Sequence, residues 1–307
     1  SSTWHALSRG FSFRVLEFGH YGGEVIPSRA FRNAGGVTAN YIARWNGLDW
    51  NALGAGVNDD VYAMAEHDGS LVVGGIFTAA GGNSVGGVAR WDGAAWHALG
   101  AGMGGGGVSA LVEFNGLLIA GGTFTTADGM PAPYLAQWTG TQWLPLGQPT
   151  NARVNALFVH DGALYVGGNF TSIGGIAANR IARWDGVTWQ ALGAGMNAQV
   201  NVLAAHLGDL VAGGNYTTAG GITANRIARW DGAGWHAFGP GVDDYVAAIV
   251  SDAGWLYVGG GQYIGGLFNG CLSRWDGSQW LPMNMGVGDF DSSEHVSALA
   301  AFGGEII

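Results

Sequence analysis

Residues 182–189 read ARWDGVTW, and this stretch decides the fold because the chain repeats it at a nearly constant spacing. A second tryptophan follows the first after five residues in every copy. The first tryptophan of the copies stands at Trp45, Trp91, Trp138, Trp184, Trp230 and Trp275. Successive copies are 45–47 residues apart, a period typical of proteins built from repeated structural units. The sequence therefore predicts a repeat architecture.

One full copy, residues 154–199, shows what each unit contains. Four short apolar segments are separated by glycine or polar turns: VNALFV at 154–159, ALYVGG at 163–168, RIARW at 180–184 and WQALG at 189–193. They are too short for helices and rich in Val, Ile, Tyr and Trp, which predicts four strands, a to d in chain order. Four strands in about 45 residues is the pattern of a β-propeller blade, with strand a innermost and strand d outermost.

The segments ALYVGG at 163–168 and RIARWDGVTW at 180–189 resemble the Kelch repeat, with its apolar strand, double glycine and spaced aromatic pair. The resemblance covers essentially the whole chain. The unit also looks like tandem-repeat propellers of secreted bacterial proteins, with a distant likeness to fungal cortical-marker propellers. This resemblance implies a Kelch-like propeller at a surface or outside the cell. It implies no particular reaction, because propellers host many functions.

The two ends of the chain bear on the number of blades. We expect one all-β domain over 1–307, with four-stranded antiparallel blades at about 15–60, 61–107, 108–153, 154–199, 200–245 and 246–295. Residues 1–14 place Trp4 where the first repeat has Trp50, and 296–307 begin with a strand a pattern. The termini are therefore predicted to form a partial seventh blade. Six blades, with both ends as overhang, is the alternative.

Composition excludes several classes of protein. The formal charge is −10, and all twelve basic residues are arginine, so there is no basic stripe for nucleic acid. The absence of lysine also excludes a P-loop and Schiff-base chemistry. No apolar run approaches the roughly 20 residues that span a bilayer, so we expect no membrane insertion. Cys271 is the single cysteine, so there is no internal disulfide, and a lone thiol leaves the compartment open. The glycine-rich, tryptophan-rich and lysine-free composition suits a secreted protein, so we expect an extracellular, cell-surface or periplasmic location.

The residues shared by all copies are expected to be structural. Asp-Gly and Asn-Gly predict the turn between strands c and d, and the tryptophan pairs that flank it are predicted to be buried. The arginine of the motif is predicted to hydrogen-bond or stack inside its own blade, at Arg44, Arg90, Arg183, Arg229 and Arg274. The repeated histidines are expected at exposed turns and strand edges: His5, His67, His97, His160, His206 and His236.

Departures from the repeat are the candidates for function, and the linkers from strand d to the next strand a differ most. These linkers are expected to share one face with the b–c loops, where binding residues collect. The candidate binding residues are Asp243, Asp244, Tyr245, Tyr263, Phe268, Phe290, Glu294 and His295. Asp289 and Asp291 could ligate calcium, which takes 6–8 oxygen ligands. A protein or glycan partner is expected at this face, and calcium is the one possible cofactor.

No catalytic motif is present in the sequence. The favoured function is therefore a non-enzymatic binding or assembly module. The alternative is a glycan-acting hydrolase or lyase that uses carboxylates of the acidic loops, such as Asp60, Asp244 or Asp291. A close carboxyl pair with one raised pKa would favour the enzyme. A structural subunit of a larger assembly is a third hypothesis.

Overall fold

The computed structural model describes residues 11, 15, 17–260, 263–264, 267–268, 271–283, 296–302 and 305–307. These residues form β-strands, turns and bends, and none of them lies in a helix that could cross a membrane. The chain divides into two compact units. The N-terminal unit is Ala6–Val154, and the C-terminal unit joins Ser1–His5 to Asn155–Ile307.

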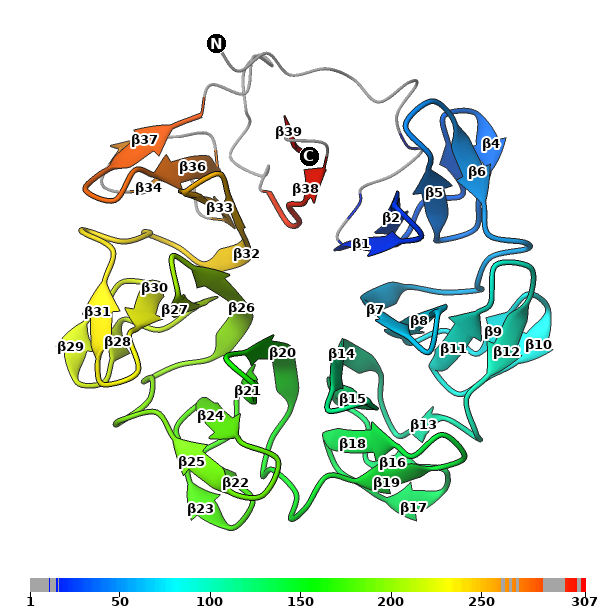
Figure 1. Ribbon diagram of the computed structural model, residues 1–307, viewed down its shortest axis with the longest axis horizontal. Helices are drawn as coiled ribbons and strands as arrows, with labels where there is room; N and C mark the ends of the chain where they lie inside the picture. Colours follow the sequence, from blue (N-terminus) through cyan, green and yellow to red (C-terminus); the bar gives the residue numbers. More distant parts are fainter. Residues whose placement is uncertain are drawn as a thin grey trace. The chain divides into compact units, whose positions relative to one another are not determined.

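The N-terminal unit holds three four-stranded antiparallel sheets, each with its strands in the order a, b, c, d (Figure 1). Its strands are β1 (Glu17–Tyr21), β2 (Glu24–Ser28), β5 (Ala43–Trp45) and β6 (Trp50–Ala52); β7 (Val61–His67), β8 (Ser70–Gly75), β11 (Val88–Trp91) and β12 (Trp96–Ala98); and β14 (Val108–Phe114), β15 (Leu117–Gly122), β18 (Leu135–Trp138) and β19 (Trp143–Pro145).

The C-terminal unit repeats this arrangement three times. Its strands are β20 (Val154–His160), β21 (Ala163–Gly168), β24 (Ile181–Trp184) and β25 (Trp189–Ala191); β26 (Val200–His206), β27 (Asp209–Gly214), β30 (Ile227–Trp230) and β31 (Trp235–Ala237); and β32 (Val246–Asp252), β33 (Trp255–Gly260), β36 (Leu272–Trp275) and β37 (Trp280–Pro282). The six sheets coincide with the six predicted repeats, and the prediction of four strands in each is confirmed.

A short hairpin between strands b and c is present in each repeat, where the sequence predicted only a turn. The hairpins are β3 (Asn33–Ala34) with β4 (Val37–Thr38), β9 (Ala79–Ala80) with β10 (Asn83–Ser84), β16 (Thr126–Ala127) with β17 (Met130–Pro131), β22 (Ser172–Ile173) with β23 (Ile176–Ala177), β28 (Thr218–Ala219) with β29 (Ile222–Thr223), and β34 (Tyr263–Ile264) with β35 (Leu267–Phe268). In β28–β29 the turn residues Gly220 and Gly221 have φ of 57° and 88°, as a type I′ turn requires. A Cβ on Gly220 would lie 2.8 Å from the Trp235 ring, so the turn also packs on strand d.

The core lies between neighbouring sheets of a unit. The double glycine that ends strand b allows the next strand a to come close. A Cβ on Gly74 would lie 2.5 Å from Val108, and one on Gly213 would lie 2.5 Å from Val246. A side chain at Gly74 or Gly213 would clash with the next strand a unless that strand shifted, which explains why glycine recurs at this position in five of the six repeats.

Four of the strand d tryptophans join their sheet to the sheet before it in the same unit. Eight of the twelve paired tryptophans are buried and the other four are half-buried, which confirms their predicted place in the core. Within each pair the ring centroids lie 4.9–5.4 Å apart. The strand d indole donates to a carbonyl of the preceding repeat: Trp96 to Leu53 (2.8 Å), Trp143 to Leu99 (3.0 Å), Trp235 to Leu192 (3.0 Å) and Trp280 to Phe238 (2.9 Å).

Both ends of the described chain occupy positions that belong to the repeat pattern. Phe11 bridges Ala34 as Val57 bridges Ala80, so Phe11 stands where a d–a linker stands in the other repeats; β13 (Met103–Gly104) pairs with β16 in the same way. At the other end, a Cβ on Gly259 would lie 2.5 Å from Val296, the relation that strand b has to the next strand a elsewhere. The hairpin of β38 (Ala301–Phe302) and β39 (Glu305–Ile306) follows.

Candidate functional site

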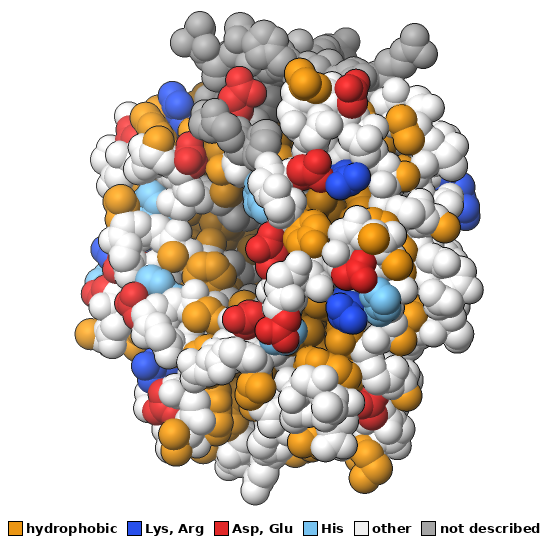
Figure 2. Space-filling view, turned by 45° about the vertical axis from the view of Figure 1, so that its right-hand side comes forward, with side chains coloured by type: hydrophobic (Ala, Val, Ile, Leu, Met, Phe, Trp, Pro, Cys, Tyr) orange, Lys and Arg blue, Asp and Glu red, His pale blue; other side chains and the backbone are white. Residues whose placement is uncertain are grey.

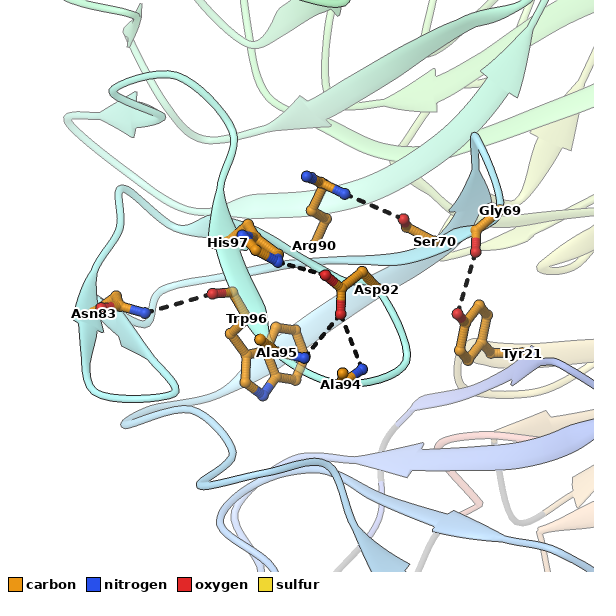
Figure 3. A network of polar contacts seen from close by, with 10 residues as sticks. All are labelled: Tyr21, Gly69, Ser70, Asn83, Arg90, Asp92, Ala94, Ala95, Trp96 and His97. Carbon is orange, nitrogen blue, oxygen red and sulfur yellow. Dashed lines mark hydrogen bonds and ion pairs between the residues drawn. The ribbon is translucent and has the colours of Figure 1, made fainter.

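The aspartate of the repeated ARWDG motif has a structural role. Asp92 Oδ1 accepts hydrogen bonds from the backbone nitrogens of Ala94 (2.9 Å) and Ala95 (2.8 Å), which closes the c–d turn (Figure 3). These backbone bonds lower the pKa of Asp92 below its ordinary value, since they favour the charged carboxylate. Backbone bonds lower the pKa of Asp185, Asp231 and Asp276 in the same way.

The arginine of the motif contacts its own sheet, as predicted. Three arginines contact the first residue of strand b: Arg44 with Glu24, Arg90 with Ser70 and Arg229 with Asp209. Where that residue is an aromatic, Arg274 lies over the Trp255 ring at 4.0 Å from its centroid. Where it is alanine, Arg183 donates to Gln190 of strand d at 3.3 Å.

The expectation of exposed histidines is wrong for the position that ends strand a. His67 and His206 are 7% and 5% exposed. His67 Nδ1 lies 2.8 Å from Glu113 Oε2, and His206 Nδ1 lies 2.8 Å from Ser251 Oγ, in each case in the following sheet. A side chain at this position fills the space between two sheets. The sequence shows only that the residue precedes a turn, and it does not show which residue of the next sheet lies opposite. Burial lowers the pKa of His206.

Two histidines that follow a strand d tryptophan, His97 and His236, are half-buried, with side chains 40% and 45% exposed, while His5 lies outside the described residues. His97 Nε2 lies 2.6 Å from Asp92 Oδ2 (Figure 3), and His236 Nε2 lies 2.7 Å from Asp231 Oδ2. These two pairs belong to the c–d turns and add a second partner to the capping carboxylate.

Four positions of the repeat differ strongly in sequence although, wherever the structure describes them, their backbones are held in one arrangement. They are the last linker residue before strand a, the second residue of strand a, the residue after the double glycine, and the residue before strand c. We call these four positions the variable cluster. In the repeat at 200–245 they are Gln199, Asn201, Asn215 and Arg226. In the repeat at 61–107 they are Asp60, Tyr62, Ile76 and Gly87.

The backbone bonds within the variable cluster recur. The nitrogen after the double glycine donates to the carbonyl of the last linker residue, from Ile76 to Asp60 at 3.1 Å and from Asn215 to Gln199 at 3.0 Å. The last glycine of strand b donates to the residue before strand c, as Gly214 does to Arg226 at 2.9 Å. The cluster is thus a fixed backbone frame that carries a different set of side chains in each repeat.

One position of the frame holds side chains in a strained backbone conformation. The residue before strand c has φ of 64–72° in all repeats, and only Gly87 is a glycine. The others are Tyr41, Tyr134, Arg180, Arg226 and Cys271. L-residues avoid this region, and strain of this kind is concentrated at functional sites. Retention of large side chains there marks the position as a candidate for function.

In the N-terminal unit the variable cluster beside Asp60 is charged. Arg29 replaces the second glycine of strand b with φ of 121°, and its Nε lies 3.2 Å from Asp60 Oδ2. The Arg29 guanidinium also lies 4.8 Å from the centroid of the Tyr62 ring. Burial, and then the negative charge of Asp60, raise the pKa of Tyr62. Asp60, a candidate for enzymatic chemistry in the sequence, is therefore held in an ion pair.

In two repeats of the C-terminal unit several of these positions carry carboxamides, while the residue before strand c is an arginine in both, Arg180 and Arg226. We call Asn155, Asn169, Gln199, Asn201 and Asn215 the amide ladder. Its side-chain bonds run from Asn155 to Asn169 (3.1 Å), from Asn169 to Gln199 (3.1 Å), from Gln199 to Asn201 (3.0 Å) and Asn215 (3.1 Å), and from Asn201 to Asn215 (2.8 Å). Asn155 and Asn201 also donate to the carbonyls of Val200 and Val246. The ladder crosses from one sheet to the next.

The predicted linker site at 243–245 lies beside this ladder and is organised by Arg226. The Arg226 guanidinium donates to the carbonyls of Asp244 and, at 3.3 Å, of Asp243. Both aspartates are exposed, whereas Tyr245 is half-buried. Burial, and then the charges of Asp244 and Cys271, raise the pKa of Tyr245. The structure thus brings three of the predicted residues together, and it adds an arginine that the sequence interpretation missed.

The remaining predicted residues are less completely placed. Tyr263 and Phe268 are direct Cα partners across the β34–β35 hairpin. The candidates Phe290, Glu294 and His295, and the possible calcium ligands Asp289 and Asp291, lie outside the described residues. Within the described part of the chain, no three His, Cys, Asp or Glu side chains are grouped so as to hold a metal ion.

One further carboxyl group was missed by the sequence interpretation. Glu17 is half-buried in strand a of the first repeat, where four other repeats place Ala63, Ala110, Ala156 and Ala248. Burial raises the pKa of Glu17 to about 8. Comparison of the repeats position by position would have found it, because it is an acidic residue where other copies carry a small apolar one. The same comparison would have found Asn169 and Asn215.

The surface is sparsely charged. On the face shown in Figure 2, acidic side chains are spread among hydrophobic and uncharged ones, and no broad basic patch is seen. This distribution agrees with the formal charge of −10.

The comparisons with known proteins concern the fold. Two segments, 67–91 and 160–184, match the family model "Domain of unknown function (DUF5122) beta-propeller". Each segment runs from the end of strand a to the first tryptophan of the motif. No curated protein sequence matches the chain.

Several solved structures superpose on nearly the whole chain at low identity. The computationally designed Ika8 protein is 16% identical, with 97% of this chain and 94% of that one covered and a TM-score of 0.57. The WD40 β-propeller domain of Doa1 is 13% identical, with 97% and 90% covered and a TM-score of 0.58. The extracellular domain of a protein described as the hybrid two-component system BT4673 from B. thetaiotaomicron is 9% identical, with 97% and 37% covered and a TM-score of 0.59. The four-stranded sheets, the family match and these structures together show that the chain is a β-propeller.

Proposed function

We propose that this β-propeller is a non-enzymatic module that binds a protein or glycan, or assembles with a partner, through its variable clusters. The observation that carries the proposal is the contrast inside each cluster: the backbone bonds recur while the side chains change from repeat to repeat. Residues needed for the fold are the same in every copy, so side chains that differ on a rigid frame are available for recognition.

The location and the finer architecture are part of this proposal. We place the protein outside the cytoplasm, at a cell surface or in a periplasm, on the basis of its lysine-free, glycine-rich composition and the resemblance to repeats of secreted proteins. We also propose Kelch-like blades, seven in number, with residues 1–14 and 296–307 contributing to the seventh. The positions of Phe11 and Val296 support that count.

The alternative of a glycan-acting hydrolase or lyase has one observation in its favour. Glu17 has the raised pKa that a general acid needs. Glycosidases also need a second carboxylate nearby, and burial is the one cause that raises the pKa of Glu17. The binding function is therefore the better supported of the two.

The test compares wild type with an exchange variant that gives the repeat at 200–245 two side chains of the repeat at 108–153, Asn201→Ser with Asn215→Thr. Both proteins are applied to arrays of neutral glycans, acidic glycans and synthetic peptides. We expect wild type to bind on at least one array and the exchange variant to bind at least tenfold more weakly. The control Gln190→Ala removes a carboxamide from the outer strand β25 and should bind as wild type does.

Two results would overturn the proposal. One is equal binding by wild type and the exchange variant, or no binding by either. The other is turnover of a glycoside that disappears in Glu17→Gln, which would favour the hydrolase.

Calcium at Asp289 and Asp291 is a separate proposal. A ligand that binds only the folded state stabilises it, so millimolar calcium should raise the Tm of wild type. Calorimetry of wild type and of Asp289→Asn with Asp291→Asn tests this. An absent shift in wild type, or an equal shift in the variant, would reject calcium at these residues.

A further inference from the structure

We propose that the amide ladder is the recognition surface for a neutral oligosaccharide, with Asn215 as its exposed hydrogen-bond donor. This inference rests on the proposed binding function and specifies its ligand. It is carried by the direction of the side-chain bonds, by the charges around them and by the exposure of the last member.

The bonds of the ladder run in one direction. Asn155 donates to Asn169, which donates to Gln199, and the remaining bonds converge on Asn215. Both side-chain N–H groups of Asn155, Gln199 and Asn201 are used within the protein. The Asn215 oxygen accepts from Gln199 at 3.1 Å and from Asn201 at 2.8 Å. These two donors fix which end of the Asn215 amide is oxygen and which is nitrogen.

The open end of the ladder is therefore a prepared donor. Asn215 is exposed, while the other four members are half-buried. Hydrogen bonds in a chain polarise one another, so an amide whose oxygen accepts two bonds donates more strongly through its nitrogen. Because the amide is already oriented, a ligand that accepts from it does not have to order it first.

The charges at the open end of the ladder favour a neutral partner. In the repeat of Asn155 and Asn169, the Arg180 guanidinium donates to the Phe170 carbonyl at 3.4 Å. The five members of the ladder carry no charge, and Asn201 connects them to Val246, which follows the linker at 243–245. The carboxylates of Asp243 and Asp244 are exposed there, so an anionic ligand would be repelled. The Arg226 guanidinium is engaged by the carbonyls of the same linker, which reduces its use as an anion site.

Sugar hydroxyls match this pattern of donors and acceptors. Each hydroxyl both donates and accepts, so one can accept from the Asn215 amide while a neighbour donates to an exposed carboxylate. Arg226 ties the two groups to one frame, because its carbonyl accepts from Gly214, next to Asn215, and its guanidinium holds the Asp243–Asp244 backbone. A row of oriented amides beside carboxylates is thus suited to a chain of hydroxyl-bearing rings.

The experiment titrates the protein with four neutral tetrasaccharides, cellotetraose, maltotetraose, xylotetraose and mannotetraose, by calorimetry. The same titrations are made with an acidic polygalacturonate fragment. We expect at least one neutral tetrasaccharide to bind and the acidic fragment not to bind. Asn215→Asp keeps the shape but removes the donor, and should weaken binding at least tenfold. Gln190→Ala should change it less than twofold. The Tm of Asn215→Asp, measured by circular dichroism, should remain within a few degrees of wild type because the side chain is exposed.

The outcomes separate this inference from the proposed function. If none of the neutral sugars binds, or if Asn215→Asp binds as wild type does, the inference is rejected. If a peptide or an acidic glycan binds instead and the exchange variant loses it, the proposed function stands and the oligosaccharide assignment fails. If the variable clusters affect no binding at all, both fail. Should Asn215→Asp unfold, Asn215→Ser takes its place, with the same tenfold expectation.

Discussion

The variable clusters beside Asp60 and beside Gln199 have the same backbone and opposite chemistry. In each, the residue after the double glycine donates to the last linker residue, at 3.1 Å and 3.0 Å respectively. The cluster beside Asp60 holds a carboxylate and a phenol that Arg29 of the preceding repeat contacts, whereas the cluster beside Gln199 holds three carboxamides and Arg226. The difference teaches that the frame does not require a particular side chain.

The side chains of the variable cluster are expected to contribute little to the free energy of folding. An ion pair with solvent access, such as Arg29 with Asp60, contributes roughly 0–1 kcal/mol to folding. A single neutral hydrogen bond contributes roughly 0.5–1.5 kcal/mol net. Burial of a tryptophan between sheets contributes several times more, so the fold depends mainly on the residues that every repeat shares.

The largest expected effect comes from breaking that shared framework. Trp143 is fully buried and donates to the Leu99 carbonyl at 3.0 Å. Trp143→Ala should lower the free energy of unfolding by about 3–5 kcal/mol, through lost contacts and the cavity left behind. Denaturant titration measures this, and the Asn201→Ser with Asn215→Thr exchange variant should lose far less. A loss below about 1 kcal/mol for Trp143→Ala would remove the distinction between framework and cluster.

Substitution of tryptophan by phenylalanine removes the indole N–H group but keeps most of the ring, so it measures the hydrogen bond apart from the packing. Trp189 Nε1 is buried without an acceptor in the described part of the chain, whereas Trp143 Nε1 has one. Trp143→Phe should therefore cost more than Trp189→Phe by about 1 kcal/mol, the net value of one hydrogen bond. An equal loss in the two variants would contradict this.

The next effect concerns a buried acid of the N-terminal unit. The pKa of Glu17 is raised to about 8, against 4.5 for the ordinary group. The native state holds the proton of the Glu17 carboxyl more tightly than the unfolded chain does. The stability that comes from this proton is complete below pH 4.5 and is lost as the pH rises through 8. Glu17→Gln should therefore raise Tm more at pH 8 than at pH 4.5. The control Asp161→Asn, at an exposed turn, should show no such difference, and the same shift in both variants would refute the effect.

The C-terminal unit should respond to pH in the opposite sense. The pKa of His206 is lowered by burial, and its Nε2 has no partner among the described residues. Stability is complete above about pH 6.5 and declines as the pH falls toward the lowered pKa, because the unfolded chain takes up the proton first. Between pH 7 and pH 5 wild type should lose more Tm than His206→Gln. Equal slopes would show that His206 does not titrate in this range. His236→Gln, on the outer strand β31, serves as the control.

The smallest expected effect restores a glycine to the first repeat. The strained backbone at Arg29 costs about 1–3 kcal/mol of stability, and Arg29→Gly removes that strain. The same substitution loses the contacts with Asp60 and Tyr62 and gives the unfolded chain more conformational freedom. These contributions nearly cancel, so the free energy of unfolding should change by less than about 1 kcal/mol. Arg29→Ala keeps the strain and loses the contacts, so it should be the less stable of the two. The reverse order would show that the side chain, not the backbone, decides stability here.

The repeat itself could be predicted from the sequence because its signals are local. Strand alternation, the Asp-Gly turn and the tryptophan pair are each set by residues close together in the chain. The b–c hairpin was missed because its strands are only two residues long, as at Asn83–Ser84, too short to show any alternation. The available signal in the sequence was a pair of glycines, such as Gly220 and Gly221, because both turn residues need a positive φ.

The candidate site was predicted only in part. The linker at 243–245 was found because acidic residues interrupt the pattern, but Arg226 was not, because its role depends on carbonyls seventeen and eighteen residues away. The amide ladder was missed since its bonds cross between sheets, and the spacing of Asn155 and Val200 in the chain gives no sign of their contact. His67 and His206 were misplaced for the same reason.

The indole bond to the preceding repeat has a consequence for how such a chain can grow. Trp235 bonds to Leu192 as Trp280 bonds to Phe238, so each copy offers the following one the same acceptor that it uses itself. From Trp184 to Trp230 is 46 residues, and a gene segment of that length encodes a module that fits both its predecessor and its successor. Duplication or exchange of one such module therefore preserves the indole bond that joins it to its neighbours. Exchange of one module replaces the four side chains of its variable cluster together. A new set of surface side chains can therefore arise by recombination, without changes elsewhere in the domain.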